Sequence, residues 1–68
     1  MPGTYKITEV VGTSAMSFAE ATKSAVAEAA RTVRNMEWFQ VVEERGKIKE
    51  GAVAEFQVTL KIGFRIER

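Results

Sequence analysis

An alternating stretch near the C-terminal end constrains the fold more than any other feature of this sequence. Its apolar side chains occupy every second position, at Phe56, Val58, Leu60, Ile62, Phe64 and Ile66. Such alternation predicts a strand with one apolar and one polar face. The stretch would extend roughly 36 Å at ~3.3 Å per residue, whereas a compact domain of this length is only about 30 Å across. One end of the strand therefore projects, or the sheet bends sharply near Gly63. In either case the apolar residues around Phe64 and Ile66 need cover from a second chain.

The small size of the chain leads to the same expectation of assembly. Its 68 residues form a single domain, residues 1–68, whose one core is marginal. Small domains gain stability from disulfides, metals or partner subunits. The sequence has no Cys and no His, which excludes disulfides and removes the commonest metal ligand and general base. Association between copies is the remaining means of stabilisation.

Charge and hydropathy argue against two further classes of protein. The formal net charge is +1, too small for long-range attraction to nucleic acid or to an anionic membrane surface. No apolar run approaches the ~20 residues of a membrane-spanning helix, and the first residues lack the apolar core of a signal peptide. We therefore expect a cytoplasmic protein.

Three strands are expected around one helix. β-branched residues favour a first strand over residues 5–11, which Gly12-Thr13-Ser14 would end. A second strand is expected over residues 38–45, followed by a loop or a strained hairpin connection over residues 46–51. The alternating stretch that begins at Phe56 is the third strand.

The helix has a clear start signal. Ser17 and Glu20 have the spacing of a capping box, and no Gly or Pro follows until after Asn35. Arg31 and Arg34 fall in the expected last turns, where they would complement the helix dipole. Small residues dominate the apolar stripe, which predicts a close approach to a curved sheet. The stripe consists of Phe18, Ala21, Ala25, Ala29, Val33 and Met36.

The order strand, helix, strand, strand predicts an α+β subunit with the split β-α-β arrangement. The longest and most apolar strand takes the middle of the sheet. We therefore expect a three-stranded antiparallel sheet in the order first, third, second, with the helix on one face. The opposite face would be polar and would carry Trp38, Gln57, Thr59, Lys61 and Arg65.

Three residues of the expected polar face and its edge suggest ligand binding. Trp38 and Phe39 are adjacent, so they point to opposite faces; the indole either packs in an oligomer contact or stacks on a planar ligand. The Gln57 amide offers a donor and an acceptor in one plane, which would match a ring edge carrying N–H and C=O groups, or it is simply solvated. Arg45 binds an anion or stays solvated.

The remaining charged residues indicate no acid–base chemistry. Glu43 and Glu44 are adjacent, so on a strand they face opposite ways and do not form a catalytic pair. Lys6, Arg65 and Arg68 would form a phosphate site if the first and third strands are neighbours. The alternative is an ordinary charged sheet face.

Five segments in order resemble the dodecins, small flavin-binding proteins. They are Val11-Gly12-Thr13-Ser14, Trp38-Phe39-Gln40-Val41, Arg45-Gly46, Glu55-Phe56-Gln57-Val58 and Gly63-Phe64-Arg65-Ile66. The likeness covers nearly the whole chain. One departure is Phe56, where tyrosine is common in the family.

The resemblance implies a hollow homododecamer of β-α-β-β subunits, with the helices outside and flavins bound in pairs at two-fold contacts. It implies that Trp38 sandwiches the flavin pair, that Gln57 contacts the ring edge and that Arg45 assists. FMN is the expected cofactor, with riboflavin, FAD or lumichrome as alternatives. Some bacterial members also bind coenzyme A near three-fold contacts, for which Lys6 and Arg65 are the candidates here.

The function expected from the sequence is sequestration, storage or buffering of flavin, with quenching of its photochemistry by the stacked indole. The alternative is a structural homo-oligomer or scaffold without a flavin, in which Trp38 is an interface anchor. A flavoenzyme is disfavoured, because stacking between a flavin and Trp38 leaves little room for a substrate. A nucleic-acid module is disfavoured by the single Trp and the net charge of +1.

Overall fold

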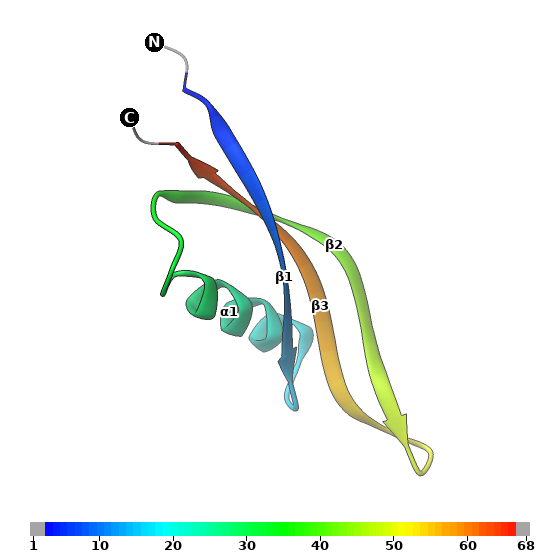
Figure 1. Ribbon diagram of the computed structural model, residues 1–68. Coiled ribbons are helices and arrows are strands. Elements are labelled where there is room, and N and C mark those ends of the chain that lie inside the picture. Colours follow the sequence, from blue (N-terminus) through cyan, green and yellow to red (C-terminus); the bar gives the residue numbers. More distant parts are fainter. Residues whose placement is uncertain (1–2, 67–68) are drawn as a thin grey trace.

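One three-stranded sheet and one helix make up the protein, which a computed structural model describes over residues 3–66. The elements are β1 (Tyr5–Ser14), α1 (Phe18–Ala29), β2 (Met36–Lys49) and β3 (Ala52–Arg65). The strands are antiparallel in the order β1-β3-β2, and α1 packs on one face of the sheet (Figure 1). This confirms the fold class and topology predicted from the sequence.

The sheet is much longer than a compact domain of this size, since the molecule measures 53 × 20 × 13 Å along its principal axes. β1 ends at Ser14, opposite Phe56, whereas the pairing of β2 with β3 continues to Lys49 and Ala52. The β2–β3 hairpin therefore extends beyond β1 as a two-stranded arm, and the ribbon curves gradually (Figure 1). Projection is thus observed at the arm, and β1 pairs with β3 through Gly63 without a register shift.

The connection between β2 and β3 is a tight hairpin turn, so the loop considered for residues 46–51 is wrong, and the hairpin alternative holds with a connection shortened to Glu50 and Gly51. Positive φ angles of 53° at Glu50 and 80° at Gly51 are those of a type I′ turn. This turn matches the right-handed twist of the flanking strands, and the strands therefore pair up to Lys49 and Ala52. The strands of the arm are exposed and carry charged residues, and such a composition is also typical of a loop.

The core is a single apolar layer between β3 and α1. Val58, Leu60 and Ile62 are fully buried in the central strand, and no polar side chain is buried with them among the described residues. The alanine stripe of α1 covers these side chains, as predicted. The helix residues in contact are Ala21, Ala25 and Ala29. Partly buried residues of the helix and of the edge strands pack at the margin, namely Val10, Phe18, Val26 and Met36.

Gly12 allows the close approach of α1 that the alanine stripe predicts. A Cβ at Gly12 would collide with the carbonyl oxygen of Ala21 and the Cβ of Ala25. Gly12 lies within β1, since this strand continues to Ser14. The prediction that Gly12-Thr13-Ser14 ends the strand is wrong, because this glycine serves packing and not a turn.

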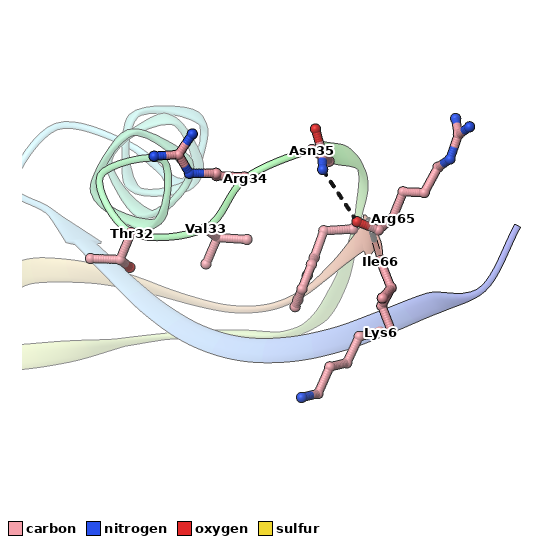
Figure 2. Close-up of a pocket in the computed structure, with 8 residues that line it drawn as sticks. Lys6, Thr32, Val33, Arg34, Asn35, Arg65 and Ile66 are labelled. Carbon is pink, nitrogen blue, oxygen red and sulfur yellow. Dashed lines mark hydrogen bonds between the residues drawn. The ribbon is translucent and has the colours of Figure 1, made fainter. Parts of the chain in front are cut away.

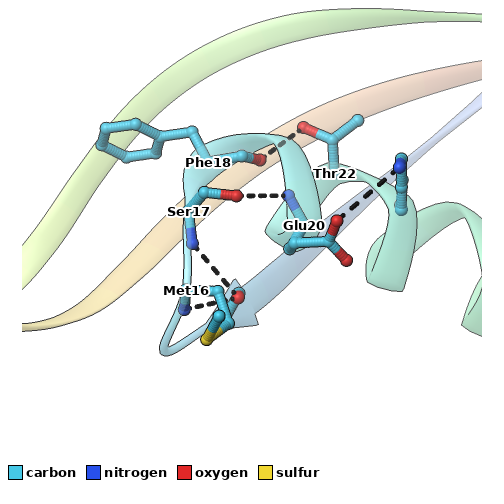
Figure 3. Close-up of polar contacts among 7 residues, drawn as sticks. Met16, Ser17, Phe18, Glu20 and Thr22 are labelled. Atoms are coloured by element: carbon cyan, nitrogen blue, oxygen red, sulfur yellow. Dashed lines mark hydrogen bonds and ion pairs between the residues drawn. The ribbon is translucent and has the colours of Figure 1, made fainter.

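The start of α1 lies where the sequence predicts it. The Ser17 Oγ accepts a hydrogen bond of 3.0 Å from the Glu20 N–H, which makes Ser17 the N-cap (Figure 3). The second half of the capping box differs from the prediction. The Ser17 N–H donates to Ser14 Oγ at 3.4 Å, and the Glu20 carboxylate lies 3.6 Å from Lys23 Nζ.

The end of α1 comes earlier than predicted. The helix stops at Ala29, and the chain turns through residues 30–35, where Asn35 has a φ of 63°. This turn brings Met36 opposite Phe64 in the sheet. Arg31 and Arg34 therefore lie beyond the helix and not in its last turns. Within residues 3–66 no helix has the length and apolarity needed to cross a membrane.

The helix side of the sheet is only partly covered. α1 lies over β1 and β3, so Phe39 and Val41 on β2 remain 51% and 42% exposed although they pair with core residues Ile62 and Leu60. Ile66, one of the residues expected to need cover, is also exposed at 41%. These bare apolar side chains agree with the predicted need for a second chain.

Candidate functional site

Four of the five candidate site residues lie on the sheet face opposite α1, namely Trp38, Arg45, Gln57 and Arg65. Cross-strand partners in an antiparallel sheet share a face. Trp38 pairs with Gly63, and Arg45 pairs with Gln57. In β3, the residues that pack against α1 alternate with Gln57 and Gly63. Trp38 and Gln57 therefore lie on the face away from the helix, as the sequence predicts. Its other β3 residues are Glu55, Thr59, Lys61 and Arg65.

A β-bulge at Glu37 places Trp38 on this face. Met36 pairs with Phe64, and Trp38 pairs with the very next residue of β3, Gly63, so Glu37 is the extra residue. A bulge reverses the facing of every later side chain in the strand. Without it, Trp38 would point to the helix side.

A second bulge at Val42 places Arg45 on the same face as Trp38. Val41 pairs with Leu60 and Glu43 with the next β3 residue, Thr59. Strict alternation from Trp38 would turn Arg45 to the helix side; the bulge returns it to the outer face, opposite Gln57. Val42 is the extra residue of this bulge. Two bulges in one strand thus decide which polar side chains share the face.

The Trp38 indole lies over Gly63. A Cβ on Gly63 would collide with three atoms of the six-membered indole ring, Cε2, Cζ2 and Cη2. The Tyr5 ring contacts the indole with a centroid separation of 5.1 Å and an interplanar angle of 53°. The residue is nonetheless 44% exposed. The indole is therefore supported by the sheet and open to a ligand.

The Gln57 amide is fixed by the side chains of Arg45 and Glu55. Its Oε1 accepts a hydrogen bond of 2.9 Å from Arg45 Nε, and its Nε2 donates one of 3.1 Å to Glu55 Oε1. Lys47 Nζ lies 3.7 Å from the same Glu55 oxygen. An amide has two acceptor lone pairs and two N–H groups. One of each remains for a ligand, in an orientation that Arg45 and Glu55 set.

Trp38 and Gln57 do not meet within one chain. Their positions along β3 are those of Gly63 and Gln57, which are about 20 Å apart at ~3.3 Å per residue. Arg45 lies with Gln57 and not with Trp38. The structure therefore brings two of the predicted residues together and leaves the indole at the other end of the face.

Lys6 and Arg65 lie on neighbouring strands, as the predicted anion site requires, and both line a cavity of about 400 Å³ together with Arg34. Their side chains point away from each other (Figure 2). Arg65 Nη1 is 3.9 Å from Glu37 Oε2 on the outer face. Lys6, the partner of Phe64, belongs to the helix side. Arg68 lies outside the described residues.

Comparison with known proteins decides the family. The family model described as Dodecin matches residues 4–67. A dodecin of Thermus thermophilus is 48% identical over 63 residues, which cover 93% of this chain and 91% of that protein. The chain belongs to the dodecin family.

Solved dodecin structures agree with this assignment. The dodecin of Streptomyces coelicolor superposes with a TM-score of 0.93 at 48% identity, covering 97% of this chain and 94% of that one. The dodecin of Streptomyces davaonensis gives 0.96 at 40% identity, with both chains covered completely. Membership of the dodecin family supports, in general terms, an assembled flavin-binding protein.

Sequence reasoning missed three residues of this dodecin face. They are Tyr5, which contacts the indole, and Glu37 and Glu55, whose carboxylates accept from Tyr5 and from Gln57. The adjacent pair Val41-Val42 breaks the alternation of β2 and is the one sequence signal of a bulge. Glu43 and Glu44 face opposite sides, as predicted. Among residues 3–66 no group of three or more Asp or Glu side chains could hold a metal ion.

Proposed function

We propose that this protein is a homododecamer that sequesters flavin, with the isoalloxazine ring of FMN or riboflavin stacked on Trp38. The observation that carries the proposal is the setting of the indole, which is held over Gly63, faces away from α1 and is 44% exposed. An indole is a broad apolar surface that stacks on planar aromatic rings. Membership of the dodecin family favours a flavin as that ring.

Gln57 and Arg45 complete the site from a second subunit. Both lie about 20 Å from Trp38 along the strand, farther than one tricyclic ring extends. In a pair of copies related by a two-fold axis, Gln57 of each copy would contact the flavin that is stacked on Trp38 of the other. The free donor and acceptor of the Gln57 amide then match the adjacent N–H and C=O groups of the flavin edge.

Assembly is supported by the apolar side chains that one chain leaves bare. Phe39, Val41 and Ile66 are exposed although they flank the core, and Ile48 and Val53 at the tip of the arm are 77% and 62% exposed. A monomer of this size gains little from so small a core. Burial between copies would remove these surfaces from water.

Stacking accounts for protection as well as storage. An excited flavin takes an electron from the indole beside it, and return of that electron restores both rings without net chemistry. Each aromatic pair adds roughly 0.5–1.5 kcal/mol beyond area burial. Storage or buffering is favoured over catalysis, because a ring stacked on both sides leaves no space for a substrate.

Titration of the apo-protein with riboflavin and with FMN tests the proposal, with flavin fluorescence as the readout. We expect strong, saturable quenching that Trp38→Ala abolishes, while chromatography with light scattering shows an unchanged assembly. Absence of quenching at micromolar protein would contradict the proposal. Trp38 would then be an assembly contact in a structural homo-oligomer.

Mixing subunits tests whether two chains build each site. Trp38→Ala and Gln57→Ala subunits are unfolded, combined in equal amounts and refolded together. Half of the two-fold pairs are then mixed, and each mixed pair keeps one complete half-site, so about a quarter of the native capacity returns. No recovery above the separate variants would show that each flavin is held by one chain.

Coenzyme A is the proposed second ligand, at the cavity near Lys6 and Arg65. The observation in its favour is that two basic residues, Lys6 and Arg34, line one cavity of about 400 Å³ that Arg65 also borders. Calorimetric titration with coenzyme A is expected to show saturable binding that Lys6→Ala weakens. A cytoplasmic location is proposed with it, on the sequence expectation alone.

A further inference from the structure

We infer that Tyr5 and Glu37 are positioning residues for the Trp38 indole, and that Arg65 acts on the indole through Glu37 and not as a ligand of the flavin phosphate. The inference deepens the proposed function, because it concerns the surface on which the flavin would stack. It assigns to Arg65 a role different from the one expected from the sequence. Its structural basis is a cluster of side chains from all three strands at one end of the outer face.

Glu37, on β2, contacts β1 and the central strand β3 through its two carboxylate oxygens. Tyr5 Oη on β1 donates a hydrogen bond of 3.2 Å to Glu37 Oε1, and Arg65 Nη1 on β3 lies 3.9 Å from Glu37 Oε2. Glu37 is also the bulge residue directly before Trp38. The bulge that turns the Trp38 indole to the outer face therefore also places the Glu37 carboxylate within reach of side chains on β1 and β3.

The hydrogen bond sets the place of the Tyr5 ring, and the ring restrains the indole. The phenol of Tyr5 is fixed at its hydroxyl by Glu37, while its ring lies 5.1 Å from the indole at 53°. Gly63 lies beneath the indole. A half-exposed Trp without such neighbours samples several rotamers, and ordering them on binding weakens affinity. The cluster removes that cost before the ligand arrives.

The cluster contributes to binding more than to folding. Tyr5, Glu37 and Arg65 lie on the face opposite the core and are all exposed. No core residue depends on them, since the buried layer lies between β3 and α1. Their loss should therefore free the indole in a protein that still folds and assembles.

The commitment of Arg65 to Glu37 distinguishes two roles for this arginine. An Arg65 that bound phosphate directly would favour FMN over riboflavin, because only FMN carries a phosphate. An Arg65 that acts through Glu37 would support both flavins equally, since both present the same ring to Trp38. The ratio of the two affinities therefore separates the roles.

Intrinsic fluorescence tests the positioning without any ligand, because the chain has one Trp and one Tyr. Time-resolved anisotropy of Trp38 is measured in the ligand-free wild type and in Tyr5→Leu, Tyr5→Phe and Glu37→Ala. We expect faster local motion of the indole in Tyr5→Leu and Glu37→Ala. Tyr5→Phe keeps the ring but loses the hydroxyl, and it should fall between them and the wild type. Lys61→Ala, on the same face but outside the cluster, is the matched control and should leave the motion unchanged.

Affinity measurements on the same variants and on Arg65→Ala complete the test, with thermal melting and light scattering to verify folding and assembly. Tyr5→Leu, Glu37→Ala and Arg65→Ala should each weaken riboflavin and FMN alike, by roughly 2- to 10-fold. Unchanged indole motion in Tyr5→Leu would overturn the inference. Loss confined to FMN in Arg65→Ala would overturn the role given to Arg65. Altered motion in a protein whose wild type quenches no flavin would support the positioning and contradict the proposed function.

Discussion

On the face covered by α1, Val58, Leu60 and Ile62 of β3 are fully buried, whereas on the opposite face the alternate residues Gln57, Thr59 and Lys61 reach solvent. One strand therefore serves both faces. On the helix side, small residues of α1 cover the central strand, and no polar group is buried there among the described residues. The outer side holds an exposed indole and a chain of polar contacts. The comparison teaches that stability and ligand binding can be altered separately, because period-two alternation assigns each to its own face.

The largest effect is expected from a core truncation. Leu60→Ala removes buried methyl groups against a rigid alanine surface, which should lower the free energy of unfolding by about 2–5 kcal/mol. The neighbouring Thr59→Ala, on the outer face, should change it by less than about 0.5 kcal/mol. Urea denaturation of both variants measures the contrast. Similar losses for the two variants would contradict the division between the faces.

Two glycine-to-alanine substitutions should have different effects on the two faces. Gly12→Ala drives a methyl group into the backbone and an Ala side chain of α1, which should cost about 1–3 kcal/mol of stability. Gly63→Ala collides only with the exposed Trp38 ring, which can swing away at lower cost. We expect Gly63→Ala to lower flavin affinity about 10-fold or more, with a smaller loss of stability than Gly12→Ala.

Denaturation and riboflavin titration of both glycine variants give the test. Equal destabilisation by the two substitutions would show that the indole is part of the core. Unchanged riboflavin affinity in Gly63→Ala would show that the position of the indole over Gly63 does not matter for binding.

The fold could be predicted because its signals are local or periodic. Alternation along β3 identified the buried face, and Ser17 marked the start of α1. The bulge at Glu37 could not be predicted, and the bulge at Val42 was signalled only by the adjacent valines, because bulges depend on which β3 residue pairs with each β2 residue. The end of α1 could not be predicted for a similar reason. The helix stops early because the chain must turn through Asn35 to pair Met36 with β3, and no helix-breaking residue marks that point in the sequence.

The candidate site was predictable only as far as single residues. Alternation predicts the correct face for Trp38 and Gln57. It does not predict how far apart residues of different strands lie along the sheet. Register shows that Arg45 meets Gln57 and that Trp38 meets Tyr5. The partners Tyr5 and Glu37 come from β1 and from a bulge, which no spacing within one strand indicates.

A smaller effect is expected at the helix start, which controls the core side alone. Ser17→Ala removes the acceptor of the Glu20 N–H bond, and the loss should be about 1 kcal/mol. Ser24→Ala, on the exposed part of the same helix, should be neutral or slightly stabilising because Ala has the higher helix propensity. Thermal melting measures both, and riboflavin affinity should be unchanged in each. A lower affinity in Ser17→Ala would mean that the faces are coupled.

The smallest stability effect is expected at Glu55, where the outer face should respond in binding alone. Glu55 Oε1 accepts from the Gln57 amide and lies 3.7 Å from Lys47 Nζ. Its ion pair is exposed on the Lys47 side, and such pairs contribute about 0–1 kcal/mol. Glu55→Ala should therefore leave unfolding nearly unchanged but free the Gln57 amide to rotate, lowering flavin affinity roughly 2- to 5-fold. Lys47→Ala, which removes the ion pair and leaves the hydrogen bond to Gln57, is the matched control. If Lys47→Ala weakened binding as much as Glu55→Ala, charge on the arm and not the orientation of the amide would govern this end of the face.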